Sequence, residues 1–524
     1  MQLYTNGTIH TLNPAAPIIE TVLVDDSGRI AFAGDLKDVN PPAGTQEIDL
    51  GGNTLLPGFN DAHVHIWKLG LLLTLQVDVR HSQPDAIPDM VGALQAHAAK
   101  HTDGWILGRG YDEASMTEGR HPTRTDLDAV STERPLAITR ICGHIMALNT
   151  RAMELAGIDA NTPDPPGGVI DRDEHGNPTG VLKESAMALV NRAIPAFTSD
   201  ALADAIAAAH QHQLSRGITS ATDPLLTPLH VDVYRQMEAQ GRMAVRTNGL
   251  AVRRLDGGTE TMPLPEKYVS DTLRLDSVKF FADGGLSGAT AAIAGTYLVT
   301  GDNGVLRYDT DDLQQLMQEA HNADYRIATH AIGDRALEQV IGCYEALYRR
   351  KPSQIRHRIE HLGLPAPEHI MRTARMNAIA VPQTVFLPAL GRNFRRYLPD
   401  DYLARCYPVR SIWEAGITVA LSSDAPVVPD DSPLLGMKAA IDRHDHAGNP
   451  IAPDEAITIK QALWGYTVGG AIASGDHHDR GTIAADKLAD FVVLDRDPLQ
   501  TPTHELTDIR VCQTISGGKT VYEA

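Results

Sequence analysis

The chain has 524 residues, 43% of them apolar and 21% charged, a composition typical of globular proteins that excludes a wholly disordered chain. Asp and Glu number 66 against 46 Lys and Arg, and the resulting formal charge of −20 argues against a nucleic-acid or anionic-membrane partner. Four widely spaced cysteines, no apolar leader and no uninterrupted apolar stretch of about 18 residues favour a cytoplasmic protein with reduced thiols.

The two ends of the chain have the same character. Residues 21–24 and 29–33 flank the turn residues 25–28, a pattern that predicts a β-hairpin within the first 57 residues. Near the other end, short apolar segments at 491–494, 511–515 and 520–522 are separated by turn residues. We therefore expect residues 1–57 and 481–524 to form one small β-domain together.

Strands and helices alternate through the middle of the chain from about Gly217. The helix predicted at about 310–323 carries an apolar stripe at helical spacing, with Asp309 or Thr310 as its N-cap. Predicted strands lie at about 217–222, 245–252, 277–282, 326–330, 356–361, 378–381 and 418–422. Strands that alternate with helices in this way indicate a parallel sheet. Residues 70–195, rich in Pro and Gly, break the alternation and are interpreted as an insertion after the first strand of that sheet.

The segment at 57–65, PGFNDAHVH, holds two histidines two positions apart. Side chains at i and i+2 of a strand point to the same face, so His63 and His65 can present two imidazoles to one metal ion. An isolated His-x-His pattern is common by chance, but these two histidines end the first strand after the β-rich start. Parallel-barrel enzymes carry their sites at the carboxyl ends of strands, which favours a metal site here.

Two more histidines and one carboxylate occupy the same kind of position. His330 and His361 each end a predicted strand, and their spacing corresponds to one strand–helix unit, so we expect them on adjacent strand ends. Asp424 follows the strand predicted two units later, where it would close the ring beside the first strand. The alternative for Asp424 is an N-cap of the following segment.

Lys279 lies within an apolar predicted strand, where a lysine is costly unless it has a partner. A neutral lysine in a metal site can take up CO2, and the resulting carbamate can bridge two cations. The alternative is an ion pair with Asp283 or another acid.

These positions resemble the amidohydrolase superfamily, and in particular its YtcJ-like branch of amidohydrolase-3 type metal-dependent hydrolases, which includes N-substituted formamide deformylases. The resemblance covers nearly the whole chain. It rests on the segments 56–65 (LPGFNDAHVH), 108–112 (GRGYD), 180–184 (GVLKE), 279–285 (KFFADGG), 328–334 (ATHAIGD), 423–426 (SDAP) and 489–495 (ADFVVLD).

The resemblance implies an α/β fold with a (β/α)8 TIM-like barrel over residues 58–480. An insertion at about 70–195 would cap the barrel, and residues 1–57 and 481–524 would form a small β-sandwich domain. The eight strands expected in the barrel end near His65, Asp223, Val252, Asp283, His330, His361, Gln383 and Asp424.

The resemblance also implies a centre with one or two divalent ions, with Zn2+ favoured by the ligand types. The first pair of histidines would bind one ion and the second pair the other. Lys279 would bridge them as a carbamate derived from CO2, with Glu184 as the alternative bridging carboxylate. Six side chains are thereby assigned to the metal: His63, His65, Lys279, His330, His361 and Asp424.

The implied activity is hydrolysis of the C–N bond of a small-molecule amide, such as an N-formyl or N-acyl compound. A metal-bound hydroxide would attack, with Asp424 as general base and acid. The insertion would shape the substrate pocket, and Tyr111, Asp112 and His144 are its candidate substrate contacts. A homodimer is an open alternative to a monomer.

Two other functions remain as alternatives. A deaminase of a cyclic amidine usually carries an HxxE pattern, but His330 is followed by Ala331, Ile332, Gly333 and Asp334. A non-catalytic ligand-binding or regulatory relative should have lost ligands, and this chain retains the expected set. Histidines on predicted helices, among them His210, His212 and His321, are interpreted as solvent-exposed.

Overall fold

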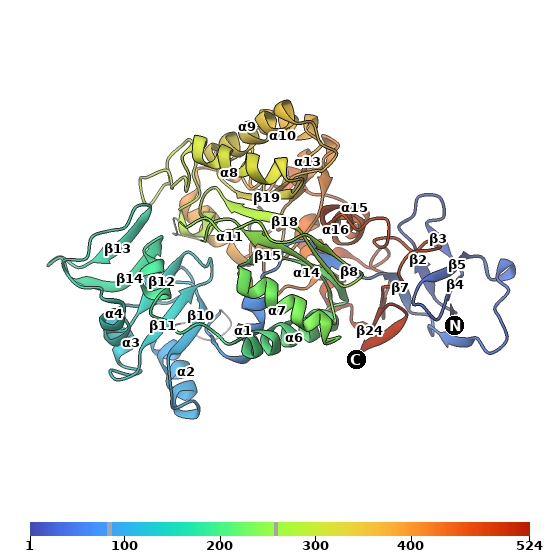
Figure 1. Cartoon of the computed structure of the whole chain (residues 1–524), viewed down its shortest axis with the longest axis horizontal. Helices are drawn as coiled ribbons and strands as arrows, with labels where there is room; N and C mark the ends of the chain where they lie inside the picture. Colours follow the sequence, from blue (N-terminus) through green and yellow to red (C-terminus); the bar gives the residue numbers. More distant parts are fainter. Residues whose placement is uncertain (81–85, 256–259) are drawn as a thin grey trace.

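The computed structural model describes residues 1–80, 86–255 and 260–524, and its centre is a parallel β-sheet curled into a barrel (Figure 1). Each strand lies parallel to the next in chain order. Beyond the last strand, the N–H of Ala62 donates to the carbonyl of Leu421 at 3.4 Å, which joins the two ends of the sheet and confirms the predicted barrel. The strands are β8 (Phe59–Asp61), β15 (Ile218–Leu226), β16 (Arg246–Val252), β18 (Leu273–Phe281), β19 (Arg326–Ala331), β20 (Arg358–His361), β21 (Ile379–Val381) and β22 (Thr418–Val419).

Helices surround this sheet because their apolar stripes pack against it. In α8 (Thr310–Asn322) the predicted stripe is buried, and the Asp309 carboxylate caps the helix by accepting from the N–H of Asp311. None of the described helices is both long and apolar enough to cross a membrane. The helices are α1 (Ile66–Thr74), α6 (Ser199–Ser215), α7 (Pro228–Ala239), α8 (Thr310–Asn322), α9 (Asp334–Arg350), α10 (Pro367–Arg375), α11 (Phe386–Tyr397), α12 (Asp400–Leu403), α13 (Val409–Glu414), α14 (Pro433–Asp442), α15 (Ile459–Trp464) and α16 (Gly470–Ser474).

Beside the barrel lie two further sheets, and the ends of the chain pair with each other in one of them (Figure 1). Strand β7 (Thr54–Pro57) pairs antiparallel with β23 (Phe491–Leu494), so that Pro57 faces Phe491. A shared apolar core contains Val22, Leu55 and Phe491. One sheet contains β5 (Ile30–Gly34), β4 (Thr21–Val24), β1 (Gln2–Thr5) and β6 (Gln46–Asp49). The other contains β25 (Lys519–Glu523), β24 (Val511–Ser516), β23 (Phe491–Leu494), β7 (Thr54–Pro57), β2 (Thr8–His10) and β3 (Ile18–Ile19).

The stretch interpreted as an insertion forms its own mixed sheet, with separate apolar clusters; its residues 81–85 lie outside the described residues. Its strands, in sheet order, are β13 (Gly168–Arg172), β14 (Pro178–Glu184), β12 (Ile145–Leu148), β11 (Leu136–Arg140), β10 (Ile106–Tyr111) and β9 (Val77–Asp78). Its helices are α2 (Ile87–Lys100), α3 (Arg124–Asp128), α4 (Thr150–Ala156) and α5 (Met187–Asn191). A further short strand, β17 (Tyr268–Val269), pairs with β18 in the barrel.

Candidate metal centre

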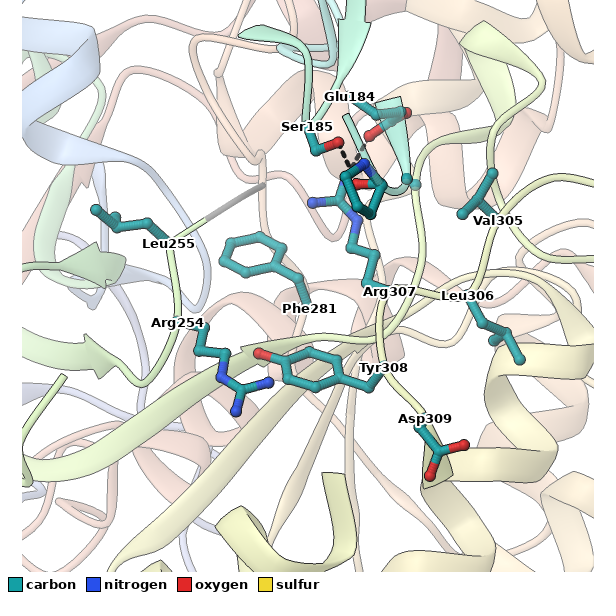
Figure 2. A pocket seen from close by; sticks show the side chains of 13 residues that line it. Glu184, Ser185, Arg254, Leu255, Phe281, Val305, Leu306, Arg307, Tyr308 and Asp309 are labelled. Carbon is teal, nitrogen blue, oxygen red and sulfur yellow. Dashed lines mark hydrogen bonds and ion pairs between the residues drawn. The ribbon is translucent and has the colours of Figure 1, made fainter. Parts of the chain in front are cut away.

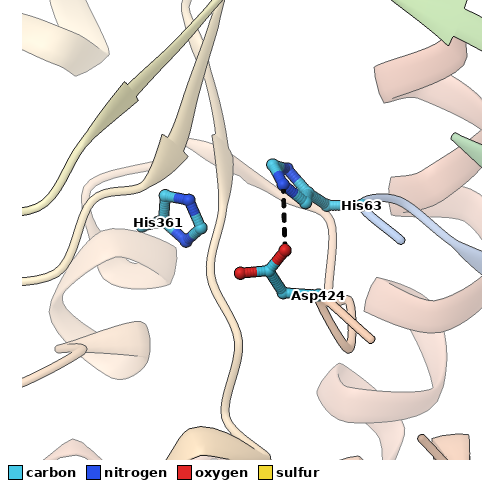
Figure 3. Close-up of side chains that lie close together, drawn as sticks. All are labelled: His63, His361 and Asp424. Atoms are coloured by element: carbon cyan, nitrogen blue, oxygen red, sulfur yellow. Dashed lines mark ion pairs between the residues drawn. The ribbon is translucent and has the colours of Figure 1, made fainter. Parts of the chain in front are cut away.

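Five of the predicted metal ligands come together at the carboxyl ends of the barrel strands. His63 and His65 follow β8, His330 lies in β19, His361 ends β20 and Asp424 follows β22. Ligand atoms of His63, His361 and Asp424 all lie within 4.8 Å of one another (Figure 3). The N–H of Asp424 donates to the carbonyl of His63 at 2.7 Å, so the end of the last strand is fixed beside the first.

The other two histidines lie next to this group. His65 Nε2 is 3.2 Å from Asp424 Oδ1, and the ring centroids of His330 and His361 are 4.4 Å apart. His361 and Asp424 have φ angles of 72° and 59°, values that are uncommon and strained for residues other than glycine. Strain of this kind persists where the surrounding structure holds it, and it is found most often at functional sites.

The contact between Asp424 and His63 shows why a cation fits this position. Nδ1 of His63 lies 2.5 Å from the Glu360 carboxylate, an acceptor, so Nδ1 carries the proton and a neutral ring keeps its lone pair on Nε2. That Nε2 lies 3.3 Å from Asp424 Oδ1, which has no hydrogen-bond partner. Two acceptors that face each other at this distance are stabilised by a cation between them. Imidazole nitrogen and carboxylate oxygen are the donors that zinc and similar divalent ions prefer.

Burial keeps the imidazoles of the centre in the form that binds metal. Desolvation holds the pKa values of His65, His330 and His361 well below their usual range, so these rings are neutral at neutral pH. Burial alone would raise the pKa of Asp424, but the adjacent imidazoles of His63 and His65 hold it well below its usual range. The site therefore combines neutral nitrogen donors with an ionised carboxylate.

Lys279 lies inside β18, fully buried, and its Nζ has no hydrogen-bond partner. The alternative partner Asp283 instead accepts from the backbone N–H groups of Ala292, Ile332 and Gly333. Burial lowers the pKa of Lys279 to about 8, which increases the neutral amine fraction that can react with CO2. Lys279 thus fits the carbamate interpretation better than the ion pair.

Side chains that the sequence analysis did not single out orient the ligands. Glu360 receives the hydrogen bond of His63 and is itself bound at 2.8 Å by the Arg358 guanidinium, with both side chains fully buried. Nδ1 of His361 lies 2.6 Å from Oε1 of Gln383. Partners of this kind fix the tautomer and orientation of a ligand ring. The available signal was the presence of Arg358 and Glu360 within a strand that ends at a predicted ligand.

The predicted substrate contacts have different surroundings. Tyr111 is fully buried in the apolar core of the insertion, and its hydroxyl lies 3.3 Å from His121 Nδ1. Asp112 accepts hydrogen bonds from Arg140 at 2.8 Å and from Asn393 of α11 at 3.1 Å, so it ties the insertion to the barrel. Of the three candidates, His144 alone lines the cavity at the metal ligands.

Glu184, the last residue of β14, is held in an ion pair. Its Oε2 accepts from Arg307 at 2.6 Å, and His144 Nδ1 lies 3.2 Å from the same oxygen. Burial alone would raise the pKa of Glu184, but the charges of His144 and Arg307 lower it to about 2. A role as bridging metal ligand would require Glu184 to leave this ion pair.

Two cavities lie at or near the centre. One of about 30 Å³ lies against His330, His361 and Asp424, and its other walls are mainly apolar. A larger cavity of about 500 Å³ lies between the insertion and the barrel (Figure 2). Phe281 and Gly284 line it, and the Gly284 carbonyl lies 3.0 Å from His330 Nε2, so Gly284 lies between the large cavity and this ligand. A substrate can therefore have a small group at the ligands and a larger group in the adjoining space.

Two histidines expected on the surface are buried. His210 of α6 is 0% exposed, and His321 of α8 is 2% exposed, with its Nδ1 2.9 Å from His357 Nε2. The expectation is wrong for these two residues because each helix turns that face towards a neighbouring element. His212 is partly buried against the Asp431 carboxylate at 2.8 Å.

Comparisons with known proteins agree with this geometry. Residues 46–522 match the amidohydrolase family. The chain is 31% identical to the putative amidohydrolase YtcJ of Bacillus subtilis (strain 168). The aligned region covers 99% of this chain and 99% of that protein. The chain is 30% identical over 99% of its length to an N-substituted formamide deformylase of Arthrobacter pascens, covering 97% of that protein.

A solved structure has the same fold. The crystal structure of an uncharacterized metal-dependent hydrolase from Pyrococcus horikoshii OT3 superposes with a TM-score of 0.78 at 24% identity, covering 96% of this chain and 99% of that one. The barrel, the terminal sheets and the insertion therefore recur together in another protein.

Proposed function

Because the chain belongs to the amidohydrolase family and is a metal-dependent hydrolase, we propose that it hydrolyses the C–N bond of a small-molecule amide, such as an N-formyl or N-acyl compound. The observation that carries this proposal is the unpartnered Asp424 Oδ1, 3.3 Å from His63 Nε2 and 3.2 Å from His65 Nε2. Full-length similarity to an N-substituted formamide deformylase supports the amide class.

The residues present can hold one or two divalent ions, for which Zn2+ is our first choice. His63, His65 and Asp424 would hold one ion, His330 and His361 a second, and carboxylated Lys279 would lie between them. A divalent ion there acts as a Lewis acid that lowers the pKa of water and polarises a carbonyl.

Asp424 is the general base and acid of the proposed reaction. Its low pKa keeps it ionised, so it can accept the proton of the attacking water and then donate that proton to the departing nitrogen. An amine leaves poorly without this proton. Apolar side chains such as Phe386, Leu390 and Val427 around the small cavity limit the access of bulk water to the reacting carbonyl.

Activity assays on metal-loaded and metal-stripped protein test this proposal. The substrates are a panel of N-formyl and N-acetyl amines, and release of formate or acetate is measured. We expect turnover by the loaded protein, its loss after chelation and its recovery when metal is restored. Turnover that persists in the stripped protein, or a loaded protein inactive on every amide while it releases ammonia from a cyclic amidine, would contradict the amide proposal.

The role of Lys279 has a separate test in metal content. If a carbamate forms there, the second metal equivalent depends on bicarbonate during reconstitution of the wild-type protein. The Lys279→Met variant should bind at most one equivalent, with or without bicarbonate. Two tightly bound equivalents in this variant would exclude the bridging role.

A further inference from the structure

Two basic side chains beside the centre lack the partners that buried cations normally have. Arg109, on β10 of the insertion, is 7% exposed, and no hydrogen bond or ion pair joins its guanidinium to any side chain or carbonyl in the described chain. Its Nε is fully enclosed. A buried guanidinium without acceptors is costly, because folding removes its water without replacing the hydrogen bonds.

Lys68 is the second such side chain. It lies in the first turn of α1, three residues after His65, and it is partly buried. Within the described residues its ammonium makes no hydrogen bond or ion pair, and its contact is the face of the Trp67 ring at 5.5 Å. Burial and the nearby positive charge of Arg109 lower the pKa of Lys68 to about 7.

Both cations border the metal centre. A Cβ at Gly143 would lie 3.3 Å from an Arg109 terminal nitrogen, so the guanidinium packs against the short loop whose Cys142 and His144 line the small cavity. The Asp424 carboxylate interacts electrostatically with both Arg109 and Lys68. The insertion thus supplies one cation and helix α1 the other, around the same carboxylate.

Two other buried arginines near the centre differ from Arg109 because each is hydrogen-bonded to an acid. Arg140 binds the Glu113 carboxylate at 2.6 Å, and Arg358 binds Glu360 at 2.8 Å. Lys68 and Arg109 instead have only the longer-range attraction of nearby carboxylates, with no hydrogen-bonded acid among the described residues. Divalent ions at the centre would add positive charge, so the missing anion must come from elsewhere.

We propose that Lys68 and Arg109 bind the carboxylate of the substrate, which makes the preferred substrates N-acyl compounds that carry a carboxylate, such as N-acyl amino acids. This inference rests on the proposed amide hydrolysis and specifies its substrate class. The planar guanidinium of Arg109 offers paired N–H donors that match a carboxylate, and the ammonium of Lys68 adds a second positive charge.

Kinetics with a matched pair of substrates test this inference. N-acetylglycine and N-acetylglycinamide differ in the anionic group, and acetate release reports cleavage of the same bond in both. For the metal-loaded wild-type protein we expect kcat/KM to favour the anion by about tenfold or more, as for a charge-assisted contact. The Arg109→Gln and Lys68→Gln variants should lose most of this preference. Arg151→Gln, which removes an exposed arginine of the same insertion, should keep it.

Equal kcat/KM values for the two substrates in the wild-type protein, or a preference retained in both variants, would overturn the inference. If neither compound is cleaved, the proposed function fails for this class, and calorimetric binding decides the carboxylate site separately. The metal-loaded wild-type protein should then still bind N-acetylglycine about tenfold more tightly than the carboxamide. Equal binding would exclude the site.

Thermal unfolding separates ligand binding from a structural role of Arg109. Because no described acceptor is hydrogen-bonded to its guanidinium, Arg109→Gln should melt at the same temperature as the wild-type protein or higher. N-acetylglycine should raise the melting temperature of the wild-type protein and leave that of the variant unchanged. A variant that melts well below the wild type would show that the protein itself uses this guanidinium, and would contradict the proposal.

Discussion

Three of the four histidines at the centre use one ring nitrogen for a contact within the protein, and this contact decides which nitrogen can face a metal ion. His63 and His361 bind Glu360 and Gln383 through Nδ1, whereas His330 contacts the carbonyl of Gly284 through Nε2. The ligands could be predicted because each ends a strand. Their partners could not, because Glu360 reaches His63 across 297 positions of the chain, a contact that only the closed barrel creates.

Replacement of Gln383 by Leu tests this orienting role. The variant removes the acceptor of His361 and leaves the ligand set intact, so we expect metal affinity to fall about 10–100-fold. Competition with a metal indicator dye measures the affinity. Gln339→Leu is the matched control, because Gln339 is also buried but donates to Tyr308 and Thr310. Equal affinities of the two variants would show that Gln383 does not orient the ligand.

At the scale of elements, strands and helices of the barrel could be predicted because each has a local signal. In α8 the stripe of Leu313 and Met317 and the cap of Asp309 give both its face and its start. The insertion sheet had no such signal, since β10 pairs parallel with β11 while β11 pairs antiparallel with β12. Pairing of this kind depends on packing between separate segments, which periodicity along one segment cannot reveal.

The contact between α8 and the segment before β20 predicts a pH-dependent stability. The Ile327 N–H donates to His357 Nδ1, and His321 Nδ1 lies 2.9 Å from His357 Nε2. Burial, together with the charges of His321 and Arg326, holds the pKa of His357 well below its usual range. The unfolded chain therefore binds this proton more readily, and the stability contributed by neutral His357 is lost as pH falls below about 6.5.

Urea unfolding midpoints at pH 8 and pH 5.5 test this prediction. The wild-type midpoint should fall between the two pH values, and it should fall less in His357→Gln, whose amide can still accept from Ile327 but does not titrate. An identical fall in both proteins would assign the pH dependence to other groups. His478→Gln, a change at an exposed histidine, should reproduce the wild-type response.

At the scale of the whole molecule, the terminal sheets and the barrel are joined by a buried ion pair. Arg246 of β16 donates to Asp490 at 2.6 and 2.9 Å, and the same carboxylate accepts from the N–H of Gly517 at 2.8 Å. Both charged side chains are less than a tenth exposed. The sequence indicated that the ends pair with each other, but it gave no sign of which barrel residue they contact.

Loss of this pair should destabilise the whole chain. Asp490→Asn leaves Arg246 with an uncompensated buried charge, which costs about 3–5 kcal/mol. The urea midpoint should fall clearly, whereas Asp204→Asn, at an exposed ion pair with Arg242, should change it little. Similar midpoints for the two variants would mean that the sheets and the barrel are not coupled through this contact.

Metal content and turnover of the Asp424→Asn variant test the central claim most directly. The asparagine keeps an oxygen near His63 and His65 but cannot carry the proton from water to the leaving nitrogen. We predict that the variant retains at least one metal equivalent and loses about a hundredfold or more of the wild-type turnover on an N-acyl substrate. A metal-loaded variant with turnover equal to the wild type would contradict the account.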